Sequence, residues 1–189
     1  MRREELFHVA RAAADVAGVR RVLILGSQAI HGSYDYEELP DEVVRSVEAD
    51  VVILDDPHGD AASLVDGALG FMSPFSRQFT YHADGMTLTE ATLPDGWEGR
   101  VVRLPTLDAH GDDIEVLFPE LHDLVVTKLH ADRPHDRRFV QALWDAGLLD
   151  VDVLLARIAL LSEAPVPKRD RLRNLVMSLK AGRSIVSRD

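Results

Sequence analysis

Apolar residues recur at three- and four-residue spacing near the N-terminus, and short unbroken apolar runs follow. The first pattern predicts an amphipathic helix over residues 2–17 that ends at Gly18. The runs at 21–25 and 48–54 predict two buried strands. A short helix through 29–31 and a polar loop are expected between these strands.

The middle of the chain alternates between helix-like and strand-like patterns. Apolar spacing predicts a helix over 58–69. Alternating residues at 77–82 and 87–93 flank Asp84-Gly85, which predicts a β-hairpin. Two further strand-like runs follow, at 101–104 and 114–118.

Helical spacing dominates after Pro119. Four amphipathic helices are expected, beginning near residues 120, 134, 151 and 168. The whole order predicts an α+β protein with a mixed β-sheet flanked by helices, followed by a C-terminal helical bundle. We therefore expect an α/β core over 1–118 and a helical region over 119–189 that packs on it.

Composition narrows the function classes. The 189 residues include 46% hydrophobic residues and no cysteine, which excludes disulfides, thiolate zinc sites and cysteine nucleophiles. No apolar run has the length of a membrane span, and charged residues interrupt the N-terminal apolar positions of a would-be signal peptide. A cytoplasmic protein without a membrane partner is expected.

The net charge of −11 is unevenly distributed. Between Glu163 and Arg188 there are seven basic and two acidic residues, so this tail is positive while the rest of the chain is acidic. A basic tail can contact RNA or the acidic surface of a protein partner. It can also be a solvated helix face.

Candidate chemistry begins with two acidic residues on one strand. Glu48 and Asp50 are two residues apart, so their side chains share a face of the second predicted strand. Two carboxylates held that close repel each other, and a divalent cation is the usual compensation. The Gly26-Ser27 turn offers backbone N–H groups for phosphate. Alternatively, the turn only connects strand to helix and both acids are solvated.

Lys128 is the second informative position. Helical projection places it among Leu121, Leu124 and Val125, on the apolar face of its helix. A lysine there requires a charged partner or a charged cleft, unless it extends to the helix edge. Asp136 lies in the first turn of the next helix, where the helix dipole alone also explains an acid.

The Gly-Ser turn followed by an acidic pair on the next strand resembles the DNA polymerase β-like nucleotidyltransferase superfamily. The matching residues are Gly26, Ser27, Glu48 and Asp50. The chain departs from the usual pattern in having glutamate as the first acid and a long spacer before it. A longer loop costs little closure entropy and does not exclude the site.

Residues 121–140 resemble a more specific group, the DUF6036-type nucleotidyltransferase-like proteins, relatives of the AbiEii and MenT toxins of type IV toxin–antitoxin systems. The resemblance spans about residues 20–150 and rests on an Asp-Leu…Lys-Leu-x-Ala-x-Arg-x-x-Asp…Phe segment. It implies that Gly26 and Ser27 hold the triphosphate, that Glu48 and Asp50 bind Mg²⁺, and that Lys128 contacts phosphate. Arg133 is expected to help bind nucleotide, and Asp136 is the last catalytic carboxylate. His135 stands where the family often has a second basic residue.

The resemblance implies Mg²⁺-dependent transfer of an NMP group from an NTP to an acceptor, with a tRNA 3′ end favoured. Such a protein would be a toxin with a protein antitoxin. The alternatives are a non-catalytic nucleotide- or protein-binding module, or a small-molecule nucleotidyltransferase. Superfamily enzymes usually add a third carboxylate, and the sequence leaves four candidates: Asp84, Glu90, Asp113 and Glu115.

Overall fold

A five-stranded mixed sheet forms the centre of the protein. The computed structural model describes residues 1–108 and 110–186. The strands are β1 (Arg21–Leu25), β2 (Glu48–Ile53), β3 (His82–Thr87), β4 (Val102–Leu107) and β5 (Asp113–Phe118). Their order is β3-β2-β1-β5-β4. The β1–β2 and β4–β5 pairs are antiparallel, whereas the β2–β3 and β1–β5 pairs are parallel.

The two faces of the sheet have different environments. Ala49, Val51 and Ile53 of β2 point into the main hydrophobic core. That core includes apolar residues of α1 (Arg3–Ala17) and α3 (Asp60–Leu69). The alternate residues of β2 point to the other face, where Val52 joins a smaller apolar cluster. Glu48 and Asp50 therefore lie on the face that the long N-terminal helices leave open.

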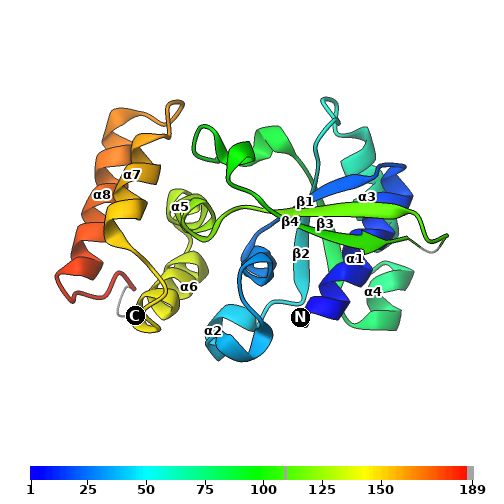
Figure 1. Ribbon diagram of the computed structural model, residues 1–189, viewed down its shortest axis with the longest axis horizontal. Coiled ribbons are helices and arrows are strands. Elements are labelled where there is room, and N and C mark those ends of the chain that lie inside the picture. The colour runs from blue at the N-terminus through cyan, green and yellow to red at the C-terminus, as the bar shows by residue number, and fades with distance from the viewer. Residues whose placement is uncertain (109, 187–189) are drawn as a thin grey trace.

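Four C-terminal helices lie at one end of the molecule, and α1, α3 and α4 (Pro74–Phe79) lie at the other (Figure 1). The C-terminal helices are α5 (Leu121–Ala131), α6 (Pro134–Asp145), α7 (Val151–Ala159) and α8 (Val166–Lys180). One hydrophobic core extends from α1 through the sheet to α8. The predicted α+β class with a mixed sheet and C-terminal helices is confirmed. The division at residue 118 stays a prediction.

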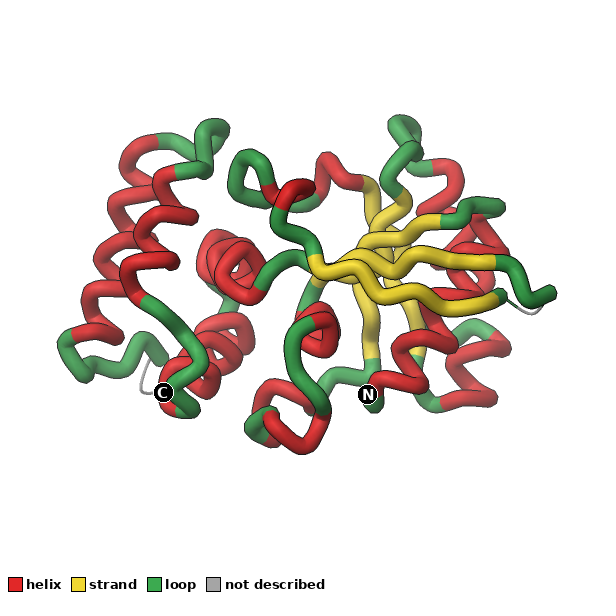
Figure 2. The backbone as a smooth tube through the Cα atoms, viewed as in Figure 1, coloured by secondary structure: helices red, strands yellow, loops and turns green. Residues whose placement is uncertain are grey.

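Short helical segments join the strands (Figure 2). η1 (Ser27–Gly32) follows β1, and α2 (Asp41–Val44) precedes β2. The other one-turn segments are η2 (Tyr36–Glu38), η3 (Leu88–Glu90) and η4 (Trp97–Gly99). Buried Gln28 of η1 donates a 2.9 Å hydrogen bond from Nε2 to the Ser46 carbonyl oxygen, which ties η1 to the entry of β2.

The predicted hairpin around Asp84-Gly85 is wrong. Ser73 caps a helix with Pro74 at its first position, so residues 74–79 form α4 and not a strand. Asp84 and Gly85 lie inside β3, which pairs in parallel with β2. A Cβ on Gly85 would lie 2.1 Å from the Ala62 carbonyl oxygen, so glycine is required there by close approach of α3, and not by a turn.

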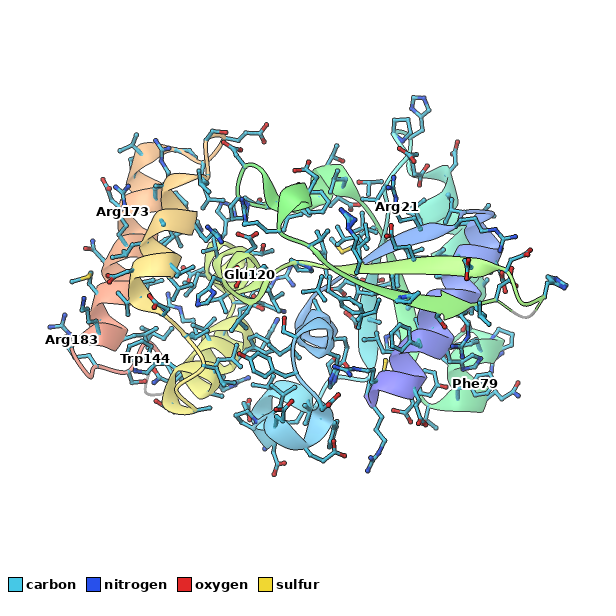
Figure 3. All side chains as sticks on the ribbon, viewed as in Figure 1. Arg21, Phe79, Glu120, Trp144, Arg173 and Arg183 are labelled. Atoms are coloured by element: carbon cyan, nitrogen blue, oxygen red, sulfur yellow. The ribbon has the colours of Figure 1, made fainter. Side chains whose placement is uncertain are left out.

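Three basic residues of the predicted tail form ion pairs within the described part of the chain. Arg171 contacts Asp132 at 2.6 Å, Arg173 contacts Asp170 at 3.2 Å, and Lys180 lies 3.9 Å from Asp152. Figure 3 shows Arg173 and Arg183 at the end of the molecule farthest from the sheet. Arg188 lies outside the described residues. Within residues 1–108 and 110–186, no helix is both long and apolar enough to cross a bilayer.

Candidate active site

A cleft of about 910 Å³ opens between the exposed sheet face, α2, and helices α5 and α6. All seven residues that the sequence singled out line it: Gly26, Ser27, Glu48, Asp50, Lys128, Arg133 and Asp136. They come from four separate segments, up to 110 positions apart in the sequence. The fold therefore brings the predicted residues into one place.

Gly26 forms the floor of the cleft at the end of β1. Its φ of 64° and ψ of −158° suit glycine alone. A Cβ at this position would lie 2.0 Å from Asp50 Oδ2. The backbone of the turn therefore approaches the Asp50 carboxylate directly, and any side chain at residue 26 would displace that carboxylate.

Three carboxylates converge on the open face of the sheet. Glu48 and Asp50 project from β2, and Asp84 projects from β3 directly opposite Asp50. One oxygen of each lies within 4.8 Å of the others, which is close enough to share a cation. Asp84 thus has the geometry of a third metal ligand beside the predicted pair.

The environment of these acids disfavours their charge. Burial raises the pKa of Asp50 to about 6, and the neighbouring Glu48 and Asp84 carboxylates add to the effect while Lys128 opposes it. Burial, followed by the proximity of Asp66 and Glu48, also raises the pKa of Asp84. Without a cation, the cluster therefore holds more negative charge than its surroundings stabilise.

Lys128 is almost completely buried, with 9% of its surface exposed. Its Nζ lies 3.0 Å from Asp136 Oδ1 and donates to Ser27 Oγ at 3.4 Å. It also stands 5.5 Å from the centre of the Phe139 ring. The apolar-face position predicted from the sequence is confirmed, and the ammonium faces the Gly26-Ser27 turn rather than extending to solvent.

Asp136 is 1% exposed, and its ion pair with Lys128 is its closest charged contact. Within the described residues, neither carboxylate oxygen accepts a well-aligned hydrogen bond. His135 Nε2 lies 3.5 Å from Oδ1 and is mostly exposed. Exposed Arg133 lines the cleft rim and forms no ion pair with the described part of the chain.

The other candidate third carboxylates have different places. Glu90 lines the cleft, but its carboxylate accepts a 2.7 Å hydrogen bond from the Thr87 backbone N–H. Asp113 and Glu115 lie on β5, where Glu115 pairs with Arg21 at the opposite end of β1 from Gly26. Of the four candidates, Asp84 alone belongs to the acidic cluster.

Two further residues of this region were not singled out from the sequence. Asp66 of α3 accepts a 2.5 Å hydrogen bond from the Gly85 N–H beside Asp84. His82 Nε2 lies 3.3 Å from Glu48 Oε2. The first contact depends on the packing of α3 against β3, and the second depends on the pairing of β3 with β2. The incorrect prediction of a hairpin excluded that pairing. A prediction of a β-α-β unit over residues 48–87 would have indicated that Asp66 and His82 lie near the acidic cluster.

A comparison with protein families agrees with this geometry. Residues 4–183 match the model of a family described as "Nucleotidyltransferase of unknown function (DUF6036)". The chain belongs to the DUF6036 family of nucleotidyltransferases. The match covers nearly the whole chain, including the C-terminal helices that the sequence resemblance did not reach.

The resemblance predicted from residues 121–140 is confirmed at the level of this family. No curated protein matches the chain, and no solved structure matches it either. The relation to toxin nucleotidyltransferases stays a prediction, as do the individual roles of the DUF6036 residues.

Proposed function

We propose that this DUF6036 protein is a Mg²⁺-dependent enzyme that transfers an NMP group from an NTP to the 3′ end of an RNA, with tRNA as the favoured acceptor. One observation carries the proposal. A buried lysine at a Gly-Ser turn and a cluster of three carboxylates face the same cleft. The first arrangement suits phosphate, and the second suits the cation that accompanies it.

The acidic cluster fits Mg²⁺ in the chemistry of its donors. Glu48, Asp50 and Asp84 offer carboxylate oxygens, which are the ligands that Mg²⁺ prefers. Seven carboxylates and three permanent cations line the cleft, so a polyphosphate needs additional positive charge to enter. When bound, Mg²⁺ neutralises phosphate charge and orients an in-line attack.

The chain's own residues then have separate tasks. Lys128 lies where its ammonium can bind a phosphate oxygen, and the 3.0 Å ion pair with buried Asp136 orients that ammonium. The Ser27 hydroxyl and the Gly26-Ser27 backbone can hold further phosphate oxygens. Exposed Arg133 at the rim can reach the nucleotide or the acceptor. The acceptor hydroxyl gives its proton to solvent and its oxygen bonds to the α-phosphorus, while the bond from the α-phosphorus to the α–β bridging oxygen breaks and pyrophosphate leaves.

The basic groups near the cleft, more than the distant end of α8, support an RNA acceptor. The Lys168 ammonium is close enough to His130 to lower the pKa of that imidazole, after burial as the larger cause. His130 lines the cleft, so the first turn of α8 approaches it. An RNA 3′ end can enter between this turn and Arg133. Modification of tRNA would make the protein growth-inhibiting and would require an antitoxin partner.

The direct test is transfer of α-labelled NTPs to total RNA with Mg²⁺, followed by separation of tRNA from other RNA. We expect label in RNA with one or more NTPs, and strong loss with Lys128→Met. Calorimetry measures NTP binding separately. Absence of both transfer and NTP binding for all four NTPs would refute the proposal.

A small-molecule acceptor is the second candidate, and a second cavity favours it. This cavity, of about 460 Å³, shares Ala91 and Thr92 with the cleft. Asp95, Glu98 and Glu163 line it together with Trp97 and Leu161. Carboxylates around an apolar floor suit a cationic organic molecule. Transfer to aminoglycosides or polyamines, with none to RNA, would select this alternative.

A non-catalytic binding module is the third candidate. Glutamate at position 48, in place of the more usual aspartate, favours it. Such a protein would bind NTP, and an Asp50→Asn variant would behave as wild type in every transfer assay.

A further inference from the structure

The most exposed large apolar side chains of the described chain lie together beside the acidic cluster. Phe71 is 79% exposed and Met72 is 69% exposed. Isolated apolar residues are common on protein surfaces, but two adjacent ones this exposed are unusual next to a charged cleft. This pair lies in the turn between α3 and α4.

The turn holds these residues outward against local backbone preference. Met72 has a φ of 67°, a left-handed conformation that is rare for a residue with a long side chain. Arg77 donates a 2.7 Å hydrogen bond from Nη1 to the Met72 carbonyl oxygen, and the Ser73 N–H donates to Gly70 at 3.0 Å. Strained backbone maintained by such contacts is concentrated at functional positions.

Two contacts connect Phe71 to the acidic cluster. Its ring centre lies 5.7 Å from that of His82, with the rings tilted by 57°. His82 Nε2 in turn lies 3.3 Å from Glu48 Oε2. Because Phe71 is 79% exposed, most of its ring surface remains open to solvent. Only the His82 side chain therefore separates the exposed Phe71 ring from Glu48 of the acidic cluster.

We propose that Phe71 is the stacking platform for the terminal nucleobase of a single-stranded RNA acceptor. The inference rests on the proposed function, since the acceptor hydroxyl must lie at the acidic cluster. Stacking on an aromatic ring suits any base, and the Arg77 guanidinium at the same turn suits an adjacent phosphate.

A protein partner fits this surface less well. A stable protein interface buries about 800 Å² on each side around a contiguous apolar centre. Here Phe71 and Met72 lie beside Arg77 and the His82–Glu48 pair. One flat apolar face among charged groups matches one base.

The test measures binding of a 5′-labelled, single-stranded oligoribonucleotide by fluorescence anisotropy, without NTP. We expect Phe71→Ala to weaken binding by about 5- to 100-fold, the range for one base stacked on an aromatic side chain. Phe71→Trp should retain affinity, and the fluorescence of its indole should be quenched when the oligonucleotide binds. Leu107→Ala is the matched control, because Leu107 is 54% exposed at the far edge strand β4.

Steady-state transfer supplies a second readout. Phe71→Ala should raise KM for the oligoribonucleotide with little change in kcat, and NTP binding by calorimetry should be unchanged. Equal oligonucleotide affinity of wild type and Phe71→Ala would overturn the inference, even if the wild type transfers nucleotide. Failure of the wild-type protein to bind the oligonucleotide would also overturn the inference. A shift of Phe71→Ala from dimer to monomer, without effect on RNA affinity, would assign the patch to protein contact instead.

Discussion

Two groups of buried charges in this protein are built in opposite ways. In α5, the Asp123 carboxylate is fully buried between two guanidinium groups, at 2.8 Å from Arg100 Nε and 3.0 Å from Arg157 Nε. In the cleft, three carboxylates share one small space, and Lys128 is the cation that acts on Asp50. Burial raises the pKa of Asp123 as well, but Arg100 and Arg157 both oppose that effect. Two cations therefore offset the one Asp123 charge, whereas the three carboxylates of the cleft have no such pair of cations beside them.

The compensated group joins distant parts of the fold. Arg100 also donates hydrogen bonds to the carbonyl oxygens of Pro94 and Asp95, and Arg157 belongs to α7. Asp123 therefore connects the segment before β4 with two C-terminal helices. Excess charge of one sign that the fold maintains without compensation is the signature of a site that binds an ion.

The largest expected effect concerns activity. Asp50→Asn removes the most buried carboxylate of the acidic cluster, and transfer should fall by at least about 10³-fold, equivalent to about 4 kcal/mol. Asp113→Asn, a carboxylate on β5 away from the cleft, should leave transfer unchanged. Steady-state kinetics measure both. Equal activity of Asp50→Asn and wild type would mean that the cluster does not serve catalysis.

Asp123→Ala should have the largest effect on folding. It leaves two guanidinium groups without their buried partner, and the free energy of unfolding should fall by about 3 to 5 kcal/mol. Urea denaturation measures the loss. The control is Asp112→Ala, which breaks a 3.0 Å pair with Arg20 on the surface and should cost less than about 1 kcal/mol. If the two losses were equal, the Asp123 network would not be the structural connection inferred here.

These two groups also differ in how much the sequence revealed. Two-residue spacing on a strand was enough to place Glu48 and Asp50 on one face, and helical projection was enough to find Lys128 on an apolar face. Both are local periodicities. Asp84 was only one of four possible third acids, because its place depends on the parallel pairing of β3 with β2. The Asp-Gly pair there imitates a hairpin turn, and local rules could not reveal the close approach of α3.

The Asp123 network was not predicted at all. Its partners come from an irregular segment and from a helix about thirty residues later, so no spacing rule relates them. The fold class followed from the order of periodic segments, and the family from one distinctive segment. A contact between distant segments could be predicted only where a residue did not suit its own element. Lys128 is such a residue, because a lysine on the apolar face of a helix requires a charged partner.

Stability should depend on pH through the acidic cluster. A carboxyl group with a raised pKa binds its proton more tightly in the folded protein, so its contribution to stability is complete below about pH 4. For Asp50, with a pKa of about 6, that contribution is lost as the pH rises from about 4 to about 6. The loss amounts to about 3 kcal/mol.

Urea denaturation between pH 4 and pH 8, in EDTA, tests this expectation. Asp50→Asn should remove most of the dependence in this range and be more stable than wild type at pH 8. Because Glu48 and Asp84 titrate in the same cluster, the midpoint belongs to the group and not to one residue. If the stability of wild type and that of Asp50→Asn changed equally between pH 4 and pH 6, the raised pKa of Asp50 would be contradicted.

Mg²⁺ should restore part of the stability that the folded protein loses as the pH rises. This is the smallest of the effects expected here. A ligand that binds only the folded state at ten times its dissociation constant adds about 1.4 kcal/mol, or about 3 to 6 °C in Tm for a chain of this length. Thermal unfolding at pH 8 with and without Mg²⁺ measures it.

Asp50→Asn and Asp84→Asn should lose the shift, because each removes one of the three converging oxygens. Asp123→Asn, although less stable, should retain it, because the Asp123 charge is already compensated by Arg100 and Arg157. An equal Mg²⁺ shift in all three variants would mean that the ion binds elsewhere. The difference in charge compensation between the acidic cluster and the Asp123 network would then not identify a metal-binding site.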